Sequence, residues 1–139
     1  MDGNLTATFL TIKSVLPGMK ARRAGVVITI SSAAARRPHP QSPIPHAAAK
    51  AGIQMLTQHL AAQVGPLGIR VNCIAPETIL TERNQERIPD AQKRALVQLH
   101  PIRRLARRTM WHRRRGFWSD GAGWITGVVL DVAGGPVMD

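Results

Sequence analysis

Two short apolar segments, Val26–Ser31 and Ile69–Ala75, constrain the fold of this chain more than any other feature. The first is β-branched and apolar almost throughout, which is typical of a strand covered on both faces, and the second indicates another strand. Between them, Ala47–Val64 repeats apolar residues at helical spacing, and its small residues permit close packing. A strand, a crossover helix and a second strand predict parallel pairing with a right-handed connection. The fold class is therefore α/β.

The remaining segments fit the same architecture. Apolar residues recur with a period near 3.6 from Asn4 to about Ala21, which predicts an amphipathic helix with Asn4 as its N-cap. We expect Pro17 to bend this helix or interrupt its hydrogen bonding, and Gly25 to close the segment. Three further segments follow from the pattern: a proline-rich loop at 36–45, a polar and partly helical stretch at 81–105, and a last strand at Val128–Val132.

Composition indicates one ordinary globular domain over residues 1–139. The single cysteine, Cys73, lies mid-strand, so we expect it to be buried and the compartment to be reducing, with the cytoplasm as the expected location. No apolar run approaches the roughly 20 residues that cross a bilayer, and residues 1–4 lack the start of a secretion signal. We therefore expect neither membrane insertion nor export.

The net charge of +11 suggests nucleic acid or an anionic membrane as a partner. Five of the 19 basic residues are arginines within Ala106–Trp118, a stretch without acids that also holds two of the three tryptophans. Without them the net charge falls from +11 to +6, which disfavours a specific nucleic-acid interface. We interpret Arg36 and Arg37 as solvated loop charges. The histidines at 39, 59, 100 and 112 lack metal-ligand spacing, so we expect surface or loop positions and no metal site.

Polar side chains follow the strands at the edge where ligands bind in open parallel sheets. Ser31 and Ser32 end the first strand, and APETILTE, 75–82, follows the second. His46 and Lys50 stand one helical turn apart at the start of the crossover helix, which returns to the same edge. A hydroxyl, a titratable ring and a cation should therefore converge there.

In their order and spacing, five motifs resemble the short-chain dehydrogenase/reductase family over nearly all of 4–138. These motifs are NLTATF at 4–9, ITISS at 28–32, HAAAKAG at 46–52, RVNCIAPETILTE at 70–82 and GWITGVVLDVAGG at 123–135. They are similar, respectively, to the helix with the active-site asparagine, the strand ending in the catalytic serine, the Tyr-x-x-x-Lys signature, the nicotinamide loop and the closing strand.

The resemblance implies hydride transfer between NAD or NADP and a small carbonyl or alcohol. It assigns the catalytic positions to Asn4, Ser32, His46 and Lys50. It assigns cofactor contacts to Lys50, Pro76, Ile79 and Thr81, and implies an oligomer. In the family, serine binds the substrate oxygen, tyrosine exchanges the proton, lysine lowers the tyrosine pKa and holds the ribose, and asparagine keeps a relay water.

The chain departs from the family at the proton donor. His46 replaces the tyrosine, and the sequence has no tyrosine at all. Lys50 would stabilise a phenolate but destabilises an imidazolium, so we expect impaired acid-base catalysis. Glu77 stands where the family usually has glycine.

A second departure is the absence of a G-x-x-x-G-x-G turn for the cofactor diphosphate. What remains resembles the C-terminal portion of a doubly wound, Rossmann-like sheet, about three parallel strands with flanking helices. The strand at 26–31 should then expose an edge, which favours association with a second copy or a related subunit. A non-catalytic interaction or dimerisation module is therefore the main alternative to a truncated, impaired oxidoreductase.

The third departure is 106–118, which is unlike the family although both flanks match it. Shifting GC-rich codons for ARRTMWH by one base can give Gly-Thr-Pro-Asp-Asp-Val-Ala, a family motif. We hypothesise that this atypical basic stretch is the product of two compensating frameshifts, and that Met1 is an internal start. Sequencing the locus tests both hypotheses. An intact alternative reading frame would support them, and a single uninterrupted frame with no upstream Gly-rich coding sequence would exclude them.

Overall fold

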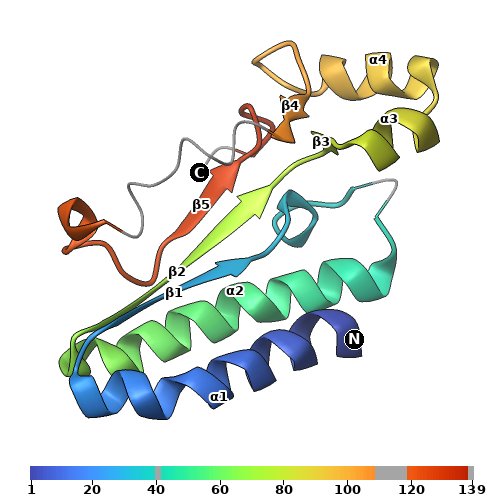
Figure 1. Cartoon of the computed structure of the whole chain (residues 1–139). Coiled ribbons are helices and arrows are strands. Elements are labelled where there is room, and N and C mark those ends of the chain that lie inside the picture. The colour runs from blue at the N-terminus through green and yellow to red at the C-terminus, as the bar shows by residue number, and fades with distance from the viewer. Residues whose placement is uncertain (40–41, 109–118, 138–139) are drawn as a thin grey trace.

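The computed structural model describes residues 1–39, 42–108 and 119–137 (Figure 1). Its helices and strands are α1 (Ala7–Arg22), β1 (Gly25–Ile30), α2 (Ile44–Val64), β2 (Ile69–Pro76), β3 (Ile79–Leu80), α3 (Glu82–Arg87), α4 (Asp90–Gln98), β4 (Ala106–Arg107) and β5 (Val129–Val132). Single turns of tighter or wider helix occupy Asp2–Thr6, Ala33–Ala35, Gly65–Leu67 and Asp120–Ala122.

Three parallel strands form the main sheet in the order β1-β2-β5, and α2 is the crossover between β1 and β2. In the register, Gly25 pairs with Ile69 and Cys73 pairs with Val129. The helices α1 and α2 run side by side along one face of the sheet (Figure 1). The predicted α/β class, the parallel βαβ unit and the last strand are confirmed.

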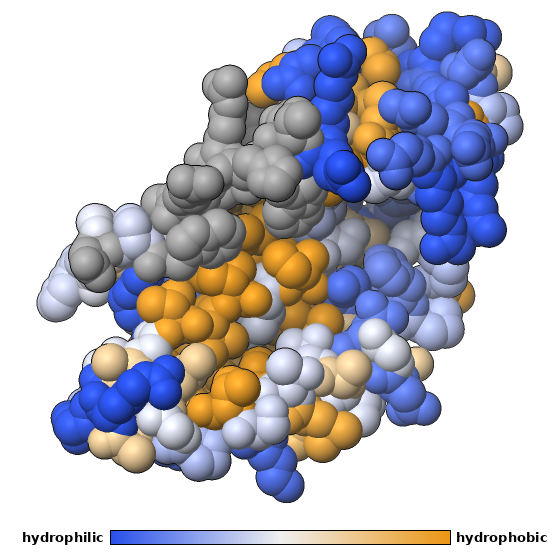
Figure 2. Space-filling view, in the orientation of Figure 1, coloured by the Kyte–Doolittle hydropathy of each residue, from blue (hydrophilic) through white to orange (hydrophobic). Residues whose placement is uncertain are grey.

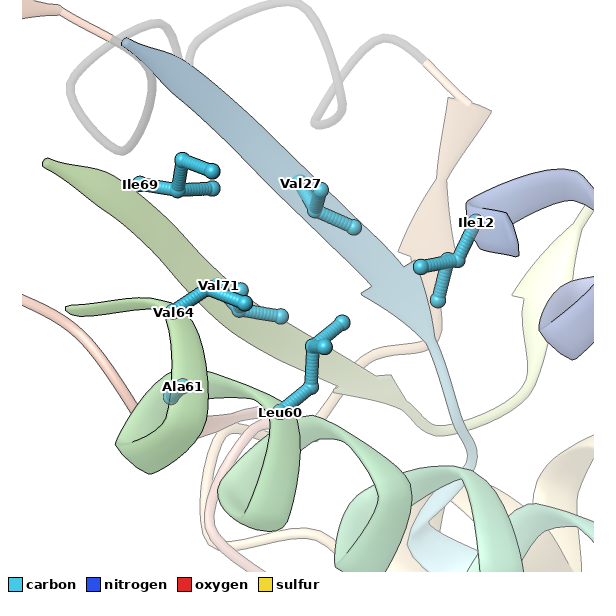
Figure 3. Packing of buried hydrophobic residues seen from close by; sticks show 7 residues of the cluster. All are labelled: Ile12, Val27, Leu60, Ala61, Val64, Ile69 and Val71. Atoms are coloured by element: carbon cyan, nitrogen blue, oxygen red, sulfur yellow. The ribbon is translucent and has the colours of Figure 1, made fainter. Parts of the chain in front are cut away.

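The core lies between these two helices and the first two strands. Seven buried residues form one cluster, shown in Figure 3: Ile12, Val27, Leu60, Ala61, Val64, Ile69 and Val71. Removing such apolar side chains from water stabilises a fold by about 25 cal/mol per Å² of buried surface. Val27 and Val71 are adjacent partners in the sheet register, so both strands face the same helices. The cluster therefore fixes where β1 and β2 end.

The two predicted strands differ in burial. Residues Val71–Ala75 of β2 are all buried, as expected for a strand covered on both faces. In β1 only Val27 and Thr29 are buried, and Ile30 is 42% exposed. The expectation that this strand is covered on both faces is wrong, because β1 lies at the edge of the sheet and the helices pack against one face. Its outer edge pairs with no strand among the described residues, as expected.

The first helix differs from expectation at both ends. Asn4 is not its N-cap; it lies within the wide helical turn Asp2–Thr6 that precedes α1. The helix continues past Pro17 to Arg22. It ends through Arg23, whose left-handed φ of 52° performs the role expected of Gly25. Gly25 instead opens β1, where a Cβ atom would lie 2.7 Å from the sulfur of Met19.

The helix α2 begins three residues earlier than predicted. Ile44 and Pro45 form its first turn, where a missing backbone N–H costs nothing. The expected close packing of small residues is confirmed at Gly52, where a Cβ atom would lie 2.9 Å from a methyl group of Leu5. The helix ends at Val64, as predicted, before the turn Gly65–Leu67.

Beyond the carboxyl edge of the sheet, β3, α3, α4 and β4 form a small outer unit (Figure 1). The strands β3 and β4 pair in parallel through Ile79 with Ala106 and Leu80 with Arg107. The predicted partly helical character of 81–105 is therefore confirmed. None of the helices described has the length and hydropathy that crossing a membrane requires. Most of the basic stretch at 106–118, namely residues 109–118, lies outside the described residues.

Candidate active site

A pocket of about 620 Å³ opens at the carboxyl edge of β1 and β2. Six residues singled out in the sequence line it: Ser32, His46, Lys50, Pro76, Ile79 and Thr81. They come from the ends of two strands, the first turns of α2 and the entry to α3. The structure thus brings together a hydroxyl, an imidazole and an ammonium group from segments far apart in the sequence.

The two serines after β1 have different environments. Ser31 is buried, and its hydroxyl donates to the backbone oxygen of Lys50 at 2.8 Å while accepting from Gln54 at 3.0 Å. Ser32 is half-buried, and its Oγ accepts from the backbone N–H of Ala34 at 3.2 Å. That contact uses an oxygen lone pair and leaves the hydroxyl proton able to donate to a ligand oxygen. Ser31 therefore holds α2 against β1, and Ser32 faces the pocket.

Lys50 is fixed at the pocket by a hydrogen bond from its Nζ to the backbone oxygen of Ile30, 2.9 Å away. Burial lowers the pKa of Lys50, while interaction with Cys73 raises it by less. Burial also lowers the pKa of His46, and the ammonium of Lys50 lowers it further. Because the ordinary histidine pKa is 6.5, His46 is neutral at pH 7. A neutral imidazole accepts a proton far more readily than it donates one.

Asn4 does not line this pocket. It contributes to a neighbouring groove of about 500 Å³ between α1 and the length of β1, and Lys50 lines both cavities. The structure therefore places Asn4 on the other side of Lys50 from Ser32 and His46.

The far wall of the pocket is held by the segment after β2. Thr81 caps α3 by accepting from the N–H of Asn84 at 3.2 Å. The amide of Asn84 donates to the backbone oxygen of Ile79 at 2.7 Å. Pro76 ends β2 beside this turn. These hydrogen bonds fix Ile79 and Thr81, two of the four residues expected to touch a cofactor, and strand pairing holds a third, Pro76.

Sequence reasoning missed a buried charge network on the same wall. The carboxylate of Glu77 is 6% exposed and lies 3.4 Å from Arg37 and 3.2 Å from His39. Arg36 pairs with Asp131 at 3.5 Å. The interpretation of Arg36 and Arg37 as solvated loop charges is therefore wrong, because Arg37 ties the loop after β1 to the segment after β2, and Arg36 ties it to β5. The sequence shows an acid in one ligand-edge loop and two adjacent arginines in another, but nothing in it specifies that they pair.

Two further expectations concern buried residues. Cys73 is fully buried in β2, as predicted. His100 lies in the loop after α4, one of the two kinds of position expected for it, but it is only 2% exposed, and its Nδ1 lies 2.6 Å from the backbone oxygen of Leu96, so a surface position is wrong. Its ring packs below the turn at Gly134. In the described ranges no cluster of three or more His, Cys, Asp or Glu residues could hold a metal ion.

Comparison with known proteins matches residues 1–136 to the family described as enoyl-(acyl carrier protein) reductase. The 3-oxoacyl-[acyl-carrier-protein] reductase FabG of Pseudomonas aeruginosa is 38% identical over 139 residues, which cover 99% of this chain and 56% of that protein. Dehydrogenase/reductase SDR family member 4 of Sus scrofa is 37% identical over 134 residues, or 95% of this chain and 48% of that protein. The chain belongs to the short-chain dehydrogenase/reductase family.

Solved structures agree with this assignment. A 3-oxoacyl-[acyl-carrier protein] reductase from Brucella melitensis superposes with a TM-score of 0.91 at 36% identity, over 98% of this chain and 51% of that one. A 3-oxoacyl-[acyl-carrier protein] reductase from the same organism with bound NAD gives a TM-score of 0.87 at 36% identity, and the match covers 98% of this chain and 50% of that one. The short-chain dehydrogenase/reductase chain described here spans about half the length of the relatives it matches.

Proposed function

We propose that this chain, which spans about half the length of its relatives, carries an impaired short-chain oxidoreductase site for hydride transfer between NAD or NADP and a small carbonyl or alcohol. The observation that carries the proposal is the shared pocket of Ser32, His46 and Lys50 at the carboxyl edge of the sheet. Catalytic roles for these residues and for Asn4 follow from family membership. The cytoplasmic location expected from the sequence stays a prediction.

The residues present fit one end of a nicotinamide cofactor. Lys50, held at 2.9 Å from the Ile30 oxygen, would hold the ribose, and Pro76, Ile79 and Thr81 would contact the nicotinamide. When bound, the nicotinamide would supply or accept the hydride. The 139 residues contain no G-x-x-x-G-x-G turn for the diphosphate end. We therefore propose that these residues by themselves bind the cofactor weakly.

The proposed impairment of catalysis follows from the chemistry of His46, which stands at the position of the proton donor. Ser32 would donate a hydrogen bond to the substrate oxygen. His46 would then have to give up a proton during carbonyl reduction, but burial and the ammonium of Lys50 favour its neutral form. The neutral ring suits proton removal from an alcohol better, although its lowered pKa makes it a weak base. Any retained activity should therefore favour alcohol oxidation at neutral pH.

Activity assays on the full chain test this proposal. Alcohol oxidation and carbonyl reduction would be measured with NAD and NADP for the natural chain, His46→Tyr and Lys50→Ala. The proposal expects at most trace activity in the natural chain, no more in Lys50→Ala, and no restoration to ordinary turnover by tyrosine alone. Ordinary enzymes turn over at about 10 s⁻¹, so robust turnover by the natural chain would overturn the proposed impairment, and robust turnover by His46→Tyr would overturn the proposed weak cofactor binding.

A second candidate function is that of an interaction module. The observation that favours it is the unpaired outer edge of β1 among the described residues. The described residues place no strand beside it, and Phe9, Leu10 and Val15 of α1 are each more than 40% exposed. Pairing with a second copy or a related subunit would cover these groups. Sedimentation of the purified chain would give a monomer if this candidate is wrong. Association that Leu10→Asp reduces, with Lys13→Asp as the control, would support it.

A further inference from the structure

A further pocket, of about 660 Å³, lies beside α4. It is lined by Leu80, Lys93, Arg94, Val97, Gln98, Arg103, Arg104, Leu105 and Arg107. None of these residues lines the pocket that holds Ser32 and His46. A ligand could therefore occupy this pocket independently of a cofactor.

The floor of the pocket is apolar. It is built from Leu80 of β3, Val97 of α4 and Leu105 just before β4. Leu105 is 6% exposed, while Leu80 and Val97 are half-buried. Figure 2 shows hydrophobic atoms among strongly hydrophilic ones over this outer unit. An aliphatic group seated there would leave water, and each methylene it buries strengthens binding about fourfold.

The rim of the pocket is cationic. Of the described residues that line it, five carry a positive charge and none carries a negative one: Lys93, Arg94, Arg103, Arg104 and Arg107. Asp90 pairs with Lys93 at 3.0 Å and partly neutralises it. The guanidinium of Arg103 donates to the side-chain oxygen of Gln98 at 3.3 Å, which anchors it at the end of α4. Only Arg107 belongs to the basic stretch at 106–118, so the charge does not depend on the frameshift hypothesis.

We propose that this pocket binds an amphiphilic organic anion, with a phosphate or carboxylate head on the arginine rim and an aliphatic tail on the Leu80, Val97 and Leu105 floor. Arginine groups bind such oxyanions through paired N–H donors, and a bound anion relieves the repulsion among the rim cations. A nucleic acid fits less well, because no aromatic side chain among the described residues lines the pocket to stack on a base.

Calorimetric titration of the full chain tests the apolar floor and the cationic rim of this pocket separately. The probes are hexyl phosphate, ethyl phosphate, inorganic phosphate and hexanol. We expect hexyl phosphate to bind at least about tenfold more tightly than ethyl phosphate, and its affinity to fall as salt is raised. Equal affinity for inorganic and hexyl phosphate would overturn the apolar half of the proposal. Equal affinity for hexanol and hexyl phosphate would overturn the cationic half.

Matched variants separate this site from the general charge of the molecule. Arg94→Ala/Arg103→Ala should weaken hexyl phosphate binding at least about fivefold. Lys13→Ala/Lys20→Ala removes the same charge from the exposed face of α1 and should leave binding unchanged. Val97→Asn should reduce the preference for hexyl over ethyl phosphate. Circular dichroism would confirm that each variant is folded. Equal weakening by both double variants would overturn the proposal and would leave the proposed oxidoreductase site untouched.

Discussion

Lys50 donates a hydrogen bond from its Nζ to the backbone oxygen of Ile30, 2.9 Å away, and so joins the start of α2 to the end of β1. The contact places the ammonium between two cavities, one lined by Ser32 and His46 and the other by Asn4. The same ammonium disfavours a protonated His46. The Lys50 cation would stabilise the ionised form of a tyrosine at position 46, but it destabilises the protonated form of His46.

Protonation of His46 should make the fold less stable at acid pH. Its pKa in the folded chain is lowered from the ordinary 6.5, so the folded state binds fewer protons than the unfolded state. Stability should thus be retained above pH 6.5 and fall as the pH drops below it, by less than about 1 kcal/mol because the ring is partly exposed. Urea midpoints at several pH values would measure this. His46→Gln should flatten the profile, whereas His59→Gln, at an exposed position, should not.

The turn before β2 requires glycine at position 68. Gly68 has a φ of +73°, and a Cβ atom there would lie 2.5 Å from the backbone oxygen of Arg23. Gly68→Ala should therefore lower the free energy of unfolding by at least about 2 kcal/mol. The control is Gly65→Ala, where φ is −53° and no atom lies within 4 Å of the added Cβ. Equal effects of the two substitutions in urea unfolding would contradict this description of the turn.

Asn72 links β2 to the segment that leads into β5. Its buried amide donates to the backbone oxygen of Ile125 at 2.9 Å and accepts from the N–H of Val128 at 3.1 Å. Asn72→Leu would leave both backbone groups without that partner, at a cost of about 2–4 kcal/mol. Gln58→Leu, on the exposed face of α2, should change the urea midpoint little.

Glu77 should hold the loop that follows β1. Its carboxylate contacts Arg37 and His39 and accepts from the N–H of Thr78 at 3.0 Å. Glu77→Gln keeps the shape but removes the charge, so amide hydrogen exchange in residues 33–39 should become faster. Exchange in that segment should be unchanged in Glu86→Gln, at an exposed site on α3. Unaltered protection in Glu77→Gln would show that the ion pairs do not restrain the loop.

The sequence predicted those features that depend on periodicity and on local order along the chain. The βαβ unit could be predicted because Val26–Ser31 and Ile69–Ala75 have the composition of strands. The helix between them repeats apolar residues along one face. The convergence of Ser32, His46 and Lys50 followed from parallel topology, which brings strand ends and the next helix start to one edge.

What the sequence missed depends on long-range contacts. The Arg37–Glu77 pair joins residues 40 positions apart, and no local pattern specifies it. The burial of His100 follows from its packing below Gly134, which comes from a different strand end. The left-handed ending of α1 at Arg23 was missed because a nearby glycine is the commoner signal.

The most direct test of the central claim is to titrate NADH and NADPH into the full chain and to measure binding by fluorescence and calorimetry. The claim is that the pocket keeps the residues for the nicotinamide end, while the sequence lacks the amide-rich turn that binds the diphosphate. We predict no saturable binding below about 1 mM for either cofactor, in the natural chain and in His46→Tyr alike. Saturable binding at about 10 µM or tighter would contradict the account.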